Sequence, residues 1–281
     1  MSTGVDFANR FKEIRTVPPV AIKVMRLIGD ENSTIREIEE TLKLDPVLVS
    51  RLLRLVNSAY FGLGRKVESI SKAIVFAGLK NLRNLVAIDA AKNLILPGSG
   101  ESSRLSARGL WLHSAVVSVI AQMMSRRIFN SGGENTFLAG VIHDIGLIIE
   151  AQLAPEDLDR ALEEFERGEK TLTECETEVL GTNHCELVTR LAEEWNLPGE
   201  IADALGGHHD RAHDPEPESI QGILRMAEYT SANLGYDDVS SRPEQLPAKL
   251  AAHMREQAGE YKVLIKDVPA EIRKARELYE S

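Results

Sequence analysis

The sequence predicts an all-α protein. Apolar residues recur at three- and four-residue spacing along most of the 281 residues, and we find no convincing apolar/polar alternation of the kind a half-buried strand shows. Short clusters of Gly, Pro, Ser and Asn separate these helical patterns, and residues suited to N-capping stand before several of them. The chain is long enough to bury a substantial core, as one large domain or two of ordinary size.

The first hundred residues predict a bundle of helices. Ser33 or Thr34 can cap one of them, with Glu37 placed for a capping box, and Pro97-Gly98-Ser99-Gly100 closes the last. That Pro/Gly/Ser segment is the best domain boundary in the chain, so we expect an N-terminal helical bundle at residues 1–100. Its helices are expected at 21–28, 35–42, after Asp45-Pro46, from Ser69 or Ser71 to Gly78, and at 82–96.

The remaining chain predicts a second helical domain at residues 101–235, packed against the first, and a charged helical extension at residues 236–281. A long helix from Leu105 to Phe129 begins this domain, and Thr182 or Asn183 can cap a later one. Further helices are expected through His143-Asp144, at 156–167, from Thr173, at 184–195, at 201–205 and at 219–234.

Composition indicates a globular protein of the cytoplasm. Hydrophobic residues make up 43% and charged residues 27%, every long apolar run is interrupted by charge, and no run reaches the ~18 residues of a membrane span. The N-terminus does not have the pattern of a secretory signal. Cys175 and Cys185 form no CxxC pair, which fits reduced thiols better than a disulfide framework.

The net charge of −10 is unevenly distributed. The stretch 150–178 has eleven acids and three bases, which we interpret as a solvated helix face. The stretch 36–83 has nine bases and five acids. The overall acidity argues against broad nucleic-acid affinity, although a local basic site remains open.

The run Val141-Ile142-His143-Asp144-Ile145-Gly146 places an imidazole and a carboxylate side by side in an apolar stretch. Adjacent residues of a helix point about 100° apart, so both side chains can reach one centre. Burying both is costly unless each has a partner. A bound cation would satisfy both, and so would a buried His–Asp hydrogen bond; the pair alone leaves both readings open.

Other histidines favour the cation. His113, His143, His184, His208 and His209 all fall in the second region, and the last two follow a Gly-Gly. Imidazole and carboxylate ligands suit Fe, Mn or Zn, and two-metal hydrolytic sites use such mixtures. We therefore expect one or two divalent ions. We treat His213 and His253 as ordinary histidines.

The order His113, His143-Asp144, His184, His208-His209 resembles the metal-binding order of the HD phosphohydrolase superfamily. In the branch that hydrolyses cyclic dinucleotides a final Asp follows on a later helix, and the resemblance places Glu228 at that position. Several N-terminal motifs and Trp195-Asn196-Leu197-Pro198 resemble the HDOD family, the HD-related output domains of bacterial signalling, over about residues 10–235. The N-terminal motifs are Val17-Pro18-Pro19, Asp45-Pro46, the run from Leu52 to Ala59 and the run from Ile70 to Gly78.

The resemblance implies an N-terminal bundle packed on an HD-like helical domain, in a signalling or regulatory module. This copy retains more of the HD ligands than many HDOD proteins. It has Leu147 where active cyclic-dinucleotide hydrolases typically carry Lys, and Asp210-Arg211-Ala212-His213 replaces their Gly-Tyr-Pro signature. Leucine cannot stabilise charge on a phosphate.

Three functions are therefore compared. The first is a stand-alone, non-catalytic signalling module that binds divalent metal and acts through a protein partner. The second is a metal-dependent phosphohydrolase acting on a nucleotide or cyclic dinucleotide. The third, least favoured, is a DNA-binding regulator that would use Arg51 and Arg54 on a helix-turn-helix between residues 35 and 55. No membrane association is expected.

Overall fold

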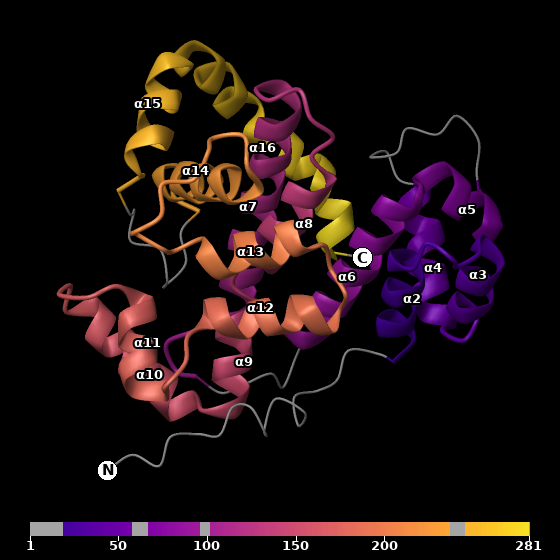
Figure 1. Cartoon of the computed structure of the whole chain (residues 1–281), viewed down its shortest axis with the longest axis horizontal. Helices are drawn as coiled ribbons and strands as arrows, with labels where there is room; N and C mark the ends of the chain where they lie inside the picture. Colours follow the sequence, from indigo (N-terminus) through magenta and orange to yellow (C-terminus); the bar gives the residue numbers. More distant parts are fainter. Residues whose placement is uncertain (1–18, 58–66, 96–101, 237–244, 281) are drawn as a thin grey trace.

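The computed structural model describes residues 19–57, 67–95, 102–236 and 245–280, and all regular secondary structure within these ranges is helical (Figure 1). The all-α prediction is confirmed. The expected boundary at Pro97-Gly98-Ser99-Gly100 lies outside the described residues, so the division of the chain at residue 100 stays a prediction.

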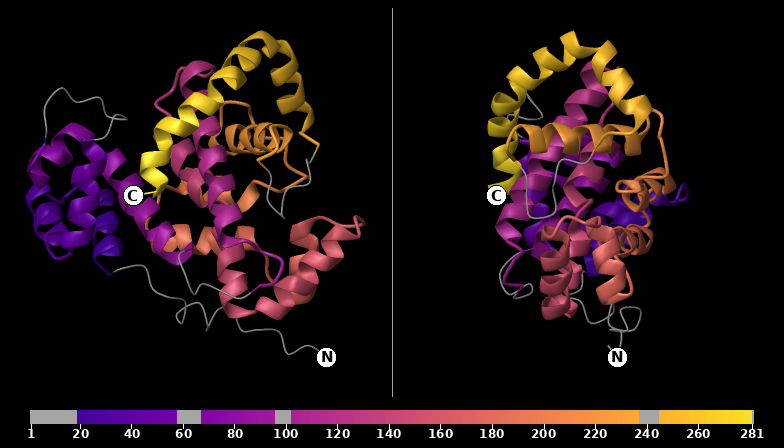
Figure 2. Two further views of the ribbon diagram at one scale, coloured as in Figure 1. Left: turned by 180° about the vertical axis from the view of Figure 1, so that it is seen from behind. Right: turned by 90° about the vertical axis from the view of Figure 1, so that its left-hand side faces the viewer.

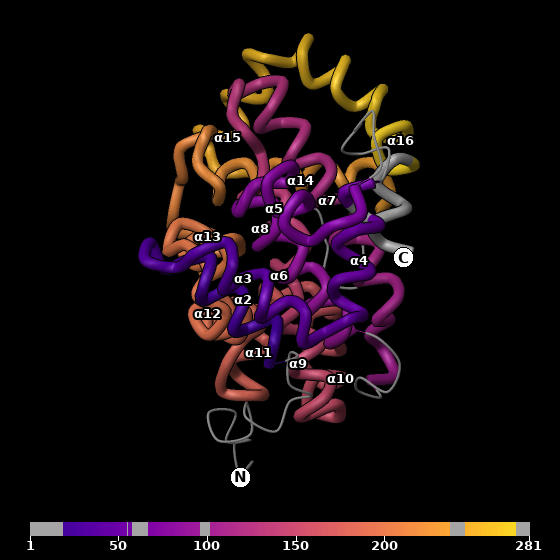
Figure 3. The backbone as a smooth tube through the Cα atoms, turned by 90° about the vertical axis from the view of Figure 1, so that its right-hand side faces the viewer, coloured from indigo at the N-terminus to yellow at the C-terminus, as the bar shows by residue number. Residues whose placement is uncertain are grey.

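The N-terminal bundle consists of α2 (Pro19–Gly29), α3 (Ile35–Leu42), α4 (Pro46–Val56), α5 (Ile70–Ala77) and α6 (Leu79–Ile95). Figure 3 shows α2 to α5 in front of the rest of the molecule. Thr34 begins α3 with the expected capping box, in which the Glu37 carboxylate accepts from the Thr34 backbone at 2.7 Å. Helix α6 packs both on α2 and on α8 and α9, so it joins the bundle to the rest of the molecule.

The central helices surround α7 (Ala107–Arg127), which packs on α8 (Glu134–Ile142) and α14 (Ile220–Asn233). Fourteen of its residues are buried because α7 is covered from several sides. The other helices of this region are α9 (Ile145–Leu153), α10 (Pro155–Glu166), α11 (Leu172–Leu180), α12 (His184–Glu194) and α13 (Gly199–Gly207).

The C-terminal residues form α15 (Ala248–Glu256) and α16 (Ala258–Glu280), which arch over the end of the molecule away from α10 and α11 (Figure 2). Helix α16 packs along α7. The Arg127 guanidinium lies 2.6 Å from the Asp267 carboxylate and 3.4 Å from that of Glu271, which ties the two helices together at their exposed edge.

One prediction about the central apolar run was wrong. The His143-Asp144 pair was expected within a helix, but α8 ends at Ile142 and α9 begins at Ile145. Asp144 has φ −99° and ψ 8°, in the bridge region that turns and active sites use. The break redirects the chain, and so both side chains face one centre.

The same segment bears on membrane insertion. Glu134–Leu153 is apolar enough over its 20 residues to qualify as a membrane span by length and composition, contrary to our expectation that no such stretch exists. In the structure, 94% of its apolar window is buried. The segment is therefore a core element, interrupted by the His143-Asp144 turn.

The acidic stretch 150–178 is not wholly a solvated face. Most of its acids lie on the exposed or half-exposed sides of α10 and α11, but Glu150 and Glu176 have no exposed surface. Two buried carboxyl groups require partners or protonation, and their position behind the histidine cluster makes them part of the site described next.

Candidate metal centre

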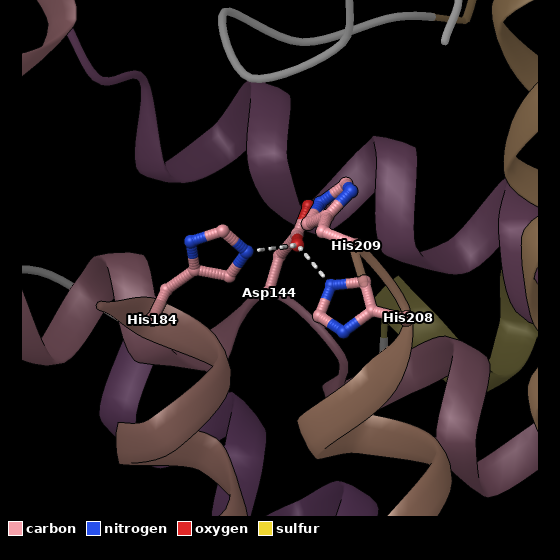
Figure 4. Close-up of side chains that lie close together, drawn as sticks. All are labelled: Asp144, His184, His208 and His209. Carbon is pink, nitrogen blue, oxygen red and sulfur yellow. Dashed lines mark ion pairs between the residues drawn. The ribbon is translucent and has the colours of Figure 1, made fainter. Parts of the chain in front are cut away.

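Five separate parts of the chain bring the seven predicted ligands together. His113 lies on α7, His143 and Asp144 in the turn between α8 and α9, and His184 at the first position of α12. The other three are His208 and His209 at the end of α13, and Glu228 on α14. Figure 4 shows the Asp144 carboxylate between His184 and His208, with His209 beside it.

The Asp144 carboxylate faces histidines on two sides. Its Oδ2 atom lies 3.1 Å from Nε2 of His143 and 3.8 Å from Nε2 of His113. Its Oδ1 atom lies 3.5 Å from Nε2 of His208 and 3.8 Å from Nε2 of His184. Each oxygen of the carboxylate thus faces a different pair of histidines.

The donors fall into two groups, and within each group the donor atoms lie within 4.8 Å of one another. The first is Asp144, His184, His208 and His209. The second is His113, His143 and Glu228, in which Glu228 Oε1 lies 3.4 Å from His143 Nε2. Two groups on either side of one carboxylate form an arrangement suited to one or two divalent ions.

Hydrogen bonds behind the histidines orient their Nε2 atoms toward Asp144. The Nδ1 atoms of His113, His143 and His208 lie 2.8, 3.0 and 2.6 Å from the backbone carbonyls of Tyr236, Gly140 and Leu205. Because a carbonyl can only accept, each of these Nδ1 atoms carries the proton. In a neutral ring Nε2 then keeps its lone pair, as a metal ligand requires.

His184 has a carboxylate behind it instead of a carbonyl. Its Nδ1 lies 2.7 Å and 2.9 Å from the two Glu176 carboxylate oxygens, and its backbone N–H donates to the same carboxylate at 3.2 Å. Asn183 caps α12 through its side chain, which fixes where the helix begins. A carboxylate–histidine pair of this kind orients the ring and raises its basicity as a ligand.

The centre is almost entirely sealed from solvent. His143, Asp144, His184 and His208 are each at most 1% exposed. His143 Nε2 and Asp144 Oδ1 make no hydrogen bond. Buried polar atoms without partners are rare and costly, and a cation coordinated between them would satisfy both, so the residues present fit a divalent metal. The chain thus has a buried His/Asp cluster that could bind a metal.

The charged groups of the centre strongly perturb one another. Burial would lower the pKa of His143, but the Asp144 carboxylate outweighs burial and raises it. Burial would raise the pKa of Asp144, but His143, His208 and His184 hold it well below its usual range. A divalent cation would take the place of the protons that these histidines otherwise gain.

Three buried groups beside the centre were missed by sequence reasoning. The sequence places both Glu176 and Glu150 among the acids of a solvated face. Burial and the Glu176 carboxylate raise the pKa of Glu150 well above the usual range. Cys185 lies 3.4 Å from His184 Nε2; burial would raise its pKa, but His184 and His208 lower it to about 5. Only its position directly after His184 could have indicated it.

Two polar contacts from α14 hold the turn that presents His208 and His209. Gln221 donates to the Gly207 carbonyl at 2.6 Å, and the buried Arg225 guanidinium donates to the Asp210 carbonyl at 2.7 Å and that of His213 at 3.2 Å. His253, treated as an ordinary histidine, stacks on Phe129 and is in neither donor group.

Comparison with known proteins identifies the family to which this chain belongs. The family model of the HDOD domain matches residues 14–211. The chain belongs to the HDOD family. An uncharacterised protein of Treponema pallidum (strain Nichols) is 24% identical over 256 residues, and the match covers 91% of this chain and 48% of that protein. The chain therefore spans about half the length of this curated relative.

Solved structures share the fold. An HDOD domain protein of unknown function from Geobacter sulfurreducens is 24% identical with a TM-score of 0.62, and the match covers 95% of this chain and 98% of that one. A candidate phosphohydrolase from Shewanella amazonensis SB2B is 23% identical with a TM-score of 0.70, and the match covers 98% of this chain and 99% of that one. A candidate signal transduction protein from Marinobacter aquaeolei VT8 is 17% identical with a TM-score of 0.69, and the match covers 96% of this chain and 60% of that one.

Proposed function

We propose that this protein is a metal-binding signalling module of the cytoplasm, which acts by binding a protein partner rather than by turning over a substrate. The observation that carries the proposal is the seven-donor centre, in which four histidines are held by their Nδ1 atoms with Nε2 directed at Asp144. Fe, Mn or Zn suits this donor set. The bound ions would supply positive charge that fixes α7, α9, α12, α13 and α14 relative to one another.

Leu147 favours binding over catalysis. Its side chain is completely buried on α9, three residues beyond Asp144. The hydrolases that the sequence resembles carry Lys here, which stabilises phosphoryl charge, and an apolar side chain cannot do so. The buried Arg225 guanidinium, for its part, is engaged by the carbonyls of Asp210 and His213. Both observations support a centre that organises the fold.

The N-terminal bundle supports a partner-binding role. Eight large hydrophobic side chains are exposed in the described part of the chain, and six of them belong to this bundle or its helix junctions. Large exposed apolar patches mark protein interaction sites, and this bundle is where the described part of the chain exposes most of its large apolar side chains. The six are Ile35, Leu44, Val47, Val75, Phe76 and Leu79.

A metal-dependent phosphohydrolase is the second candidate. It is favoured by Asp144, whose two oxygens face the two donor groups. Two bound ions would activate water and polarise a phosphoryl group of a nucleotide or cyclic dinucleotide. In that case the histidines, Asp144 and Glu228 would hold the ions.

Hydrolysis assays separate the two candidates. Protein loaded with Mn²⁺, Fe²⁺ or Zn²⁺ is incubated with nucleotides and cyclic dinucleotides, beside the double variant His143→Ala, Asp144→Ala. We expect equal, background product release from both. Turnover near the ~1 s⁻¹ of ordinary enzymes, abolished in the double variant, would establish the phosphohydrolase instead.

A further inference from the structure

We infer that Cys185 is an additional ligand of the metal centre, through its sulfur. The half of the centre formed by Asp144, His184, His208 and His209 would then hold its ion by a thiolate as well as by nitrogen and oxygen. This inference rests on the proposed metal binding and adds a ligand type that determines which metal is preferred. Cys185 directly follows His184 on the first turn of α12, and its side chain is 5% exposed.

The position of the sulfur fits coordination beside His184. Cys185 Sγ lies 3.4 Å from His184 Nε2, the nitrogen directed at Asp144. It also lies beside the His208 ring, 3.6 Å from Nδ1 and 4.0 Å from Nε2. With Zn–S near 2.3 Å and Zn–N near 2.05 Å, two ligands of one tetrahedral ion are about 3.5 Å apart. The separation from His184 Nε2 matches this value, and the separation from His208 Nε2 is about 0.5 Å longer.

An independent feature shows that this half of the centre requires a ligand. Asp144 Oδ1 is buried without a hydrogen bond, and it lies 3.5 Å from His208 Nε2 and 3.8 Å from His184 Nε2. A tetrahedral ion places nitrogen and oxygen ligands about 3.3–3.4 Å apart, so the separation from His208 is close to this value and the separation from His184 is longer. His184, His208, Asp144 and Cys185 therefore offer two nitrogens, one oxygen and one sulfur, with His209 at the more exposed side of the group.

Coordination by sulfur has a chemical consequence. A metal–sulfur bond forms to the Cys185 thiolate, and the proton that the thiolate shares with the neighbouring His184 and His208 passes to solvent, so metal binding releases a proton. Thiolate favours Zn²⁺ and Fe²⁺ over Mn²⁺, whereas the other half, with His113, His143 and Glu228, offers only nitrogen and oxygen. The two halves should thus differ in metal preference.

Cobalt substitution tests this assignment. Chelator-treated protein is titrated with Co²⁺, and thiolate-to-cobalt charge-transfer absorption in the near ultraviolet is recorded for the wild type, Cys185→Ser and Cys175→Ser. Cys175 is the matched control because it is also buried but lies on α11, where the charged groups around it are Glu164, Lys170 and Glu178 instead of histidines. We expect the band in the wild type and in Cys175→Ser, and its loss in Cys185→Ser with at least ~10-fold weaker Zn²⁺ binding.

Bound cobalt without a thiolate band, or a band that survives in Cys185→Ser, would overturn the assignment while leaving the metal centre intact. Absence of bound cobalt from the wild type would overturn both. If Cys185→Ser does not fold, zinc-edge X-ray absorption of the Cys175→Ser protein decides: one sulfur at about 2.3 Å is expected, and a shell of nitrogen and oxygen alone would contradict it.

Discussion

Gly146 marks the closest approach between the two helices that hold Asp144 and His184. A Cβ atom at residue 146 would lie 2.1 Å from the His184 carbonyl oxygen and 2.5 Å from its Cα. Ordinary van der Waals contact begins at 3.4 Å, so Gly146→Ala requires the starts of α9 and α12 to separate by roughly 1.3 Å. The opposing atoms are backbone, which cannot rotate away.

The displaced residue is itself a ligand, so the effect on metal binding should be large. Metal–ligand distances tolerate deviations of only about 0.2 Å, and a shift several times larger would remove His184 from its place beside Asp144. We expect Gly146→Ala to weaken Zn²⁺ binding by more than ~100-fold. Overpacking should also lower the free energy of unfolding by about 1–3 kcal/mol.

Calorimetric Zn²⁺ titration and urea unfolding measure the two effects. Gly199→Ala is the matched control, because a Cβ there meets no atom within 4 Å. It should bind Zn²⁺ like the wild type. If Gly146→Ala bound Zn²⁺ as tightly as Gly199→Ala, the close packing of α9 on α12 would not position the ligands, and the reasoning would be refuted.

Two further predictions concern the carboxyl groups behind His184. Glu176→Gln should weaken Zn²⁺ binding about 10–100-fold, measured by competition with a chelating dye. The control Glu178→Gln, at an exposed position, should bind Zn²⁺ like the wild type. Equal affinities of the two variants would contradict the role of Glu176. Because burial raises the pKa of Glu150, the folded state keeps a proton that the unfolded state loses, so apo-protein stability falls as pH rises above the ordinary carboxyl range. Glu150→Gln should make this fall shallower, by up to ~1.4 kcal/mol per pH unit. Urea unfolding with chelator between about pH 5 and 7 measures it, and parallel wild-type and variant curves would contradict the prediction.

Local sequence signals predicted most of the fold. The Thr34 and Ser69 caps lie where hydroxyl residues precede an apolar stripe, and Gly78 ends α5 as expected. Such signals act within one turn of a helix, so they can be read without knowing the tertiary structure. The break at His143-Asp144 was missed because the surrounding run is uniformly apolar, and its turn depends on contacts from other helices.

The centre was predictable in its inner ligands but not in its surroundings. The order of the histidines and Asp144 indicated a metal site, and the structure brings all of them together with Glu228. Glu150 and Glu176 could not be separated from nine solvated acids of the same stretch, because their burial is decided by the packing of α9 and α12. The role of Cys185 likewise depends on where His208 lies, 23 residues away.

Metal content tests the central claim most directly. Elemental analysis of untagged, freshly purified protein is compared with the Asp144→Ala variant, which removes the carboxylate shared by both donor groups. We predict one or two equivalents of Fe, Mn or Zn in the wild type and loss of at least one equivalent in the variant. Equal metal content in the two proteins, or none in either, would contradict a metal centre organised around Asp144.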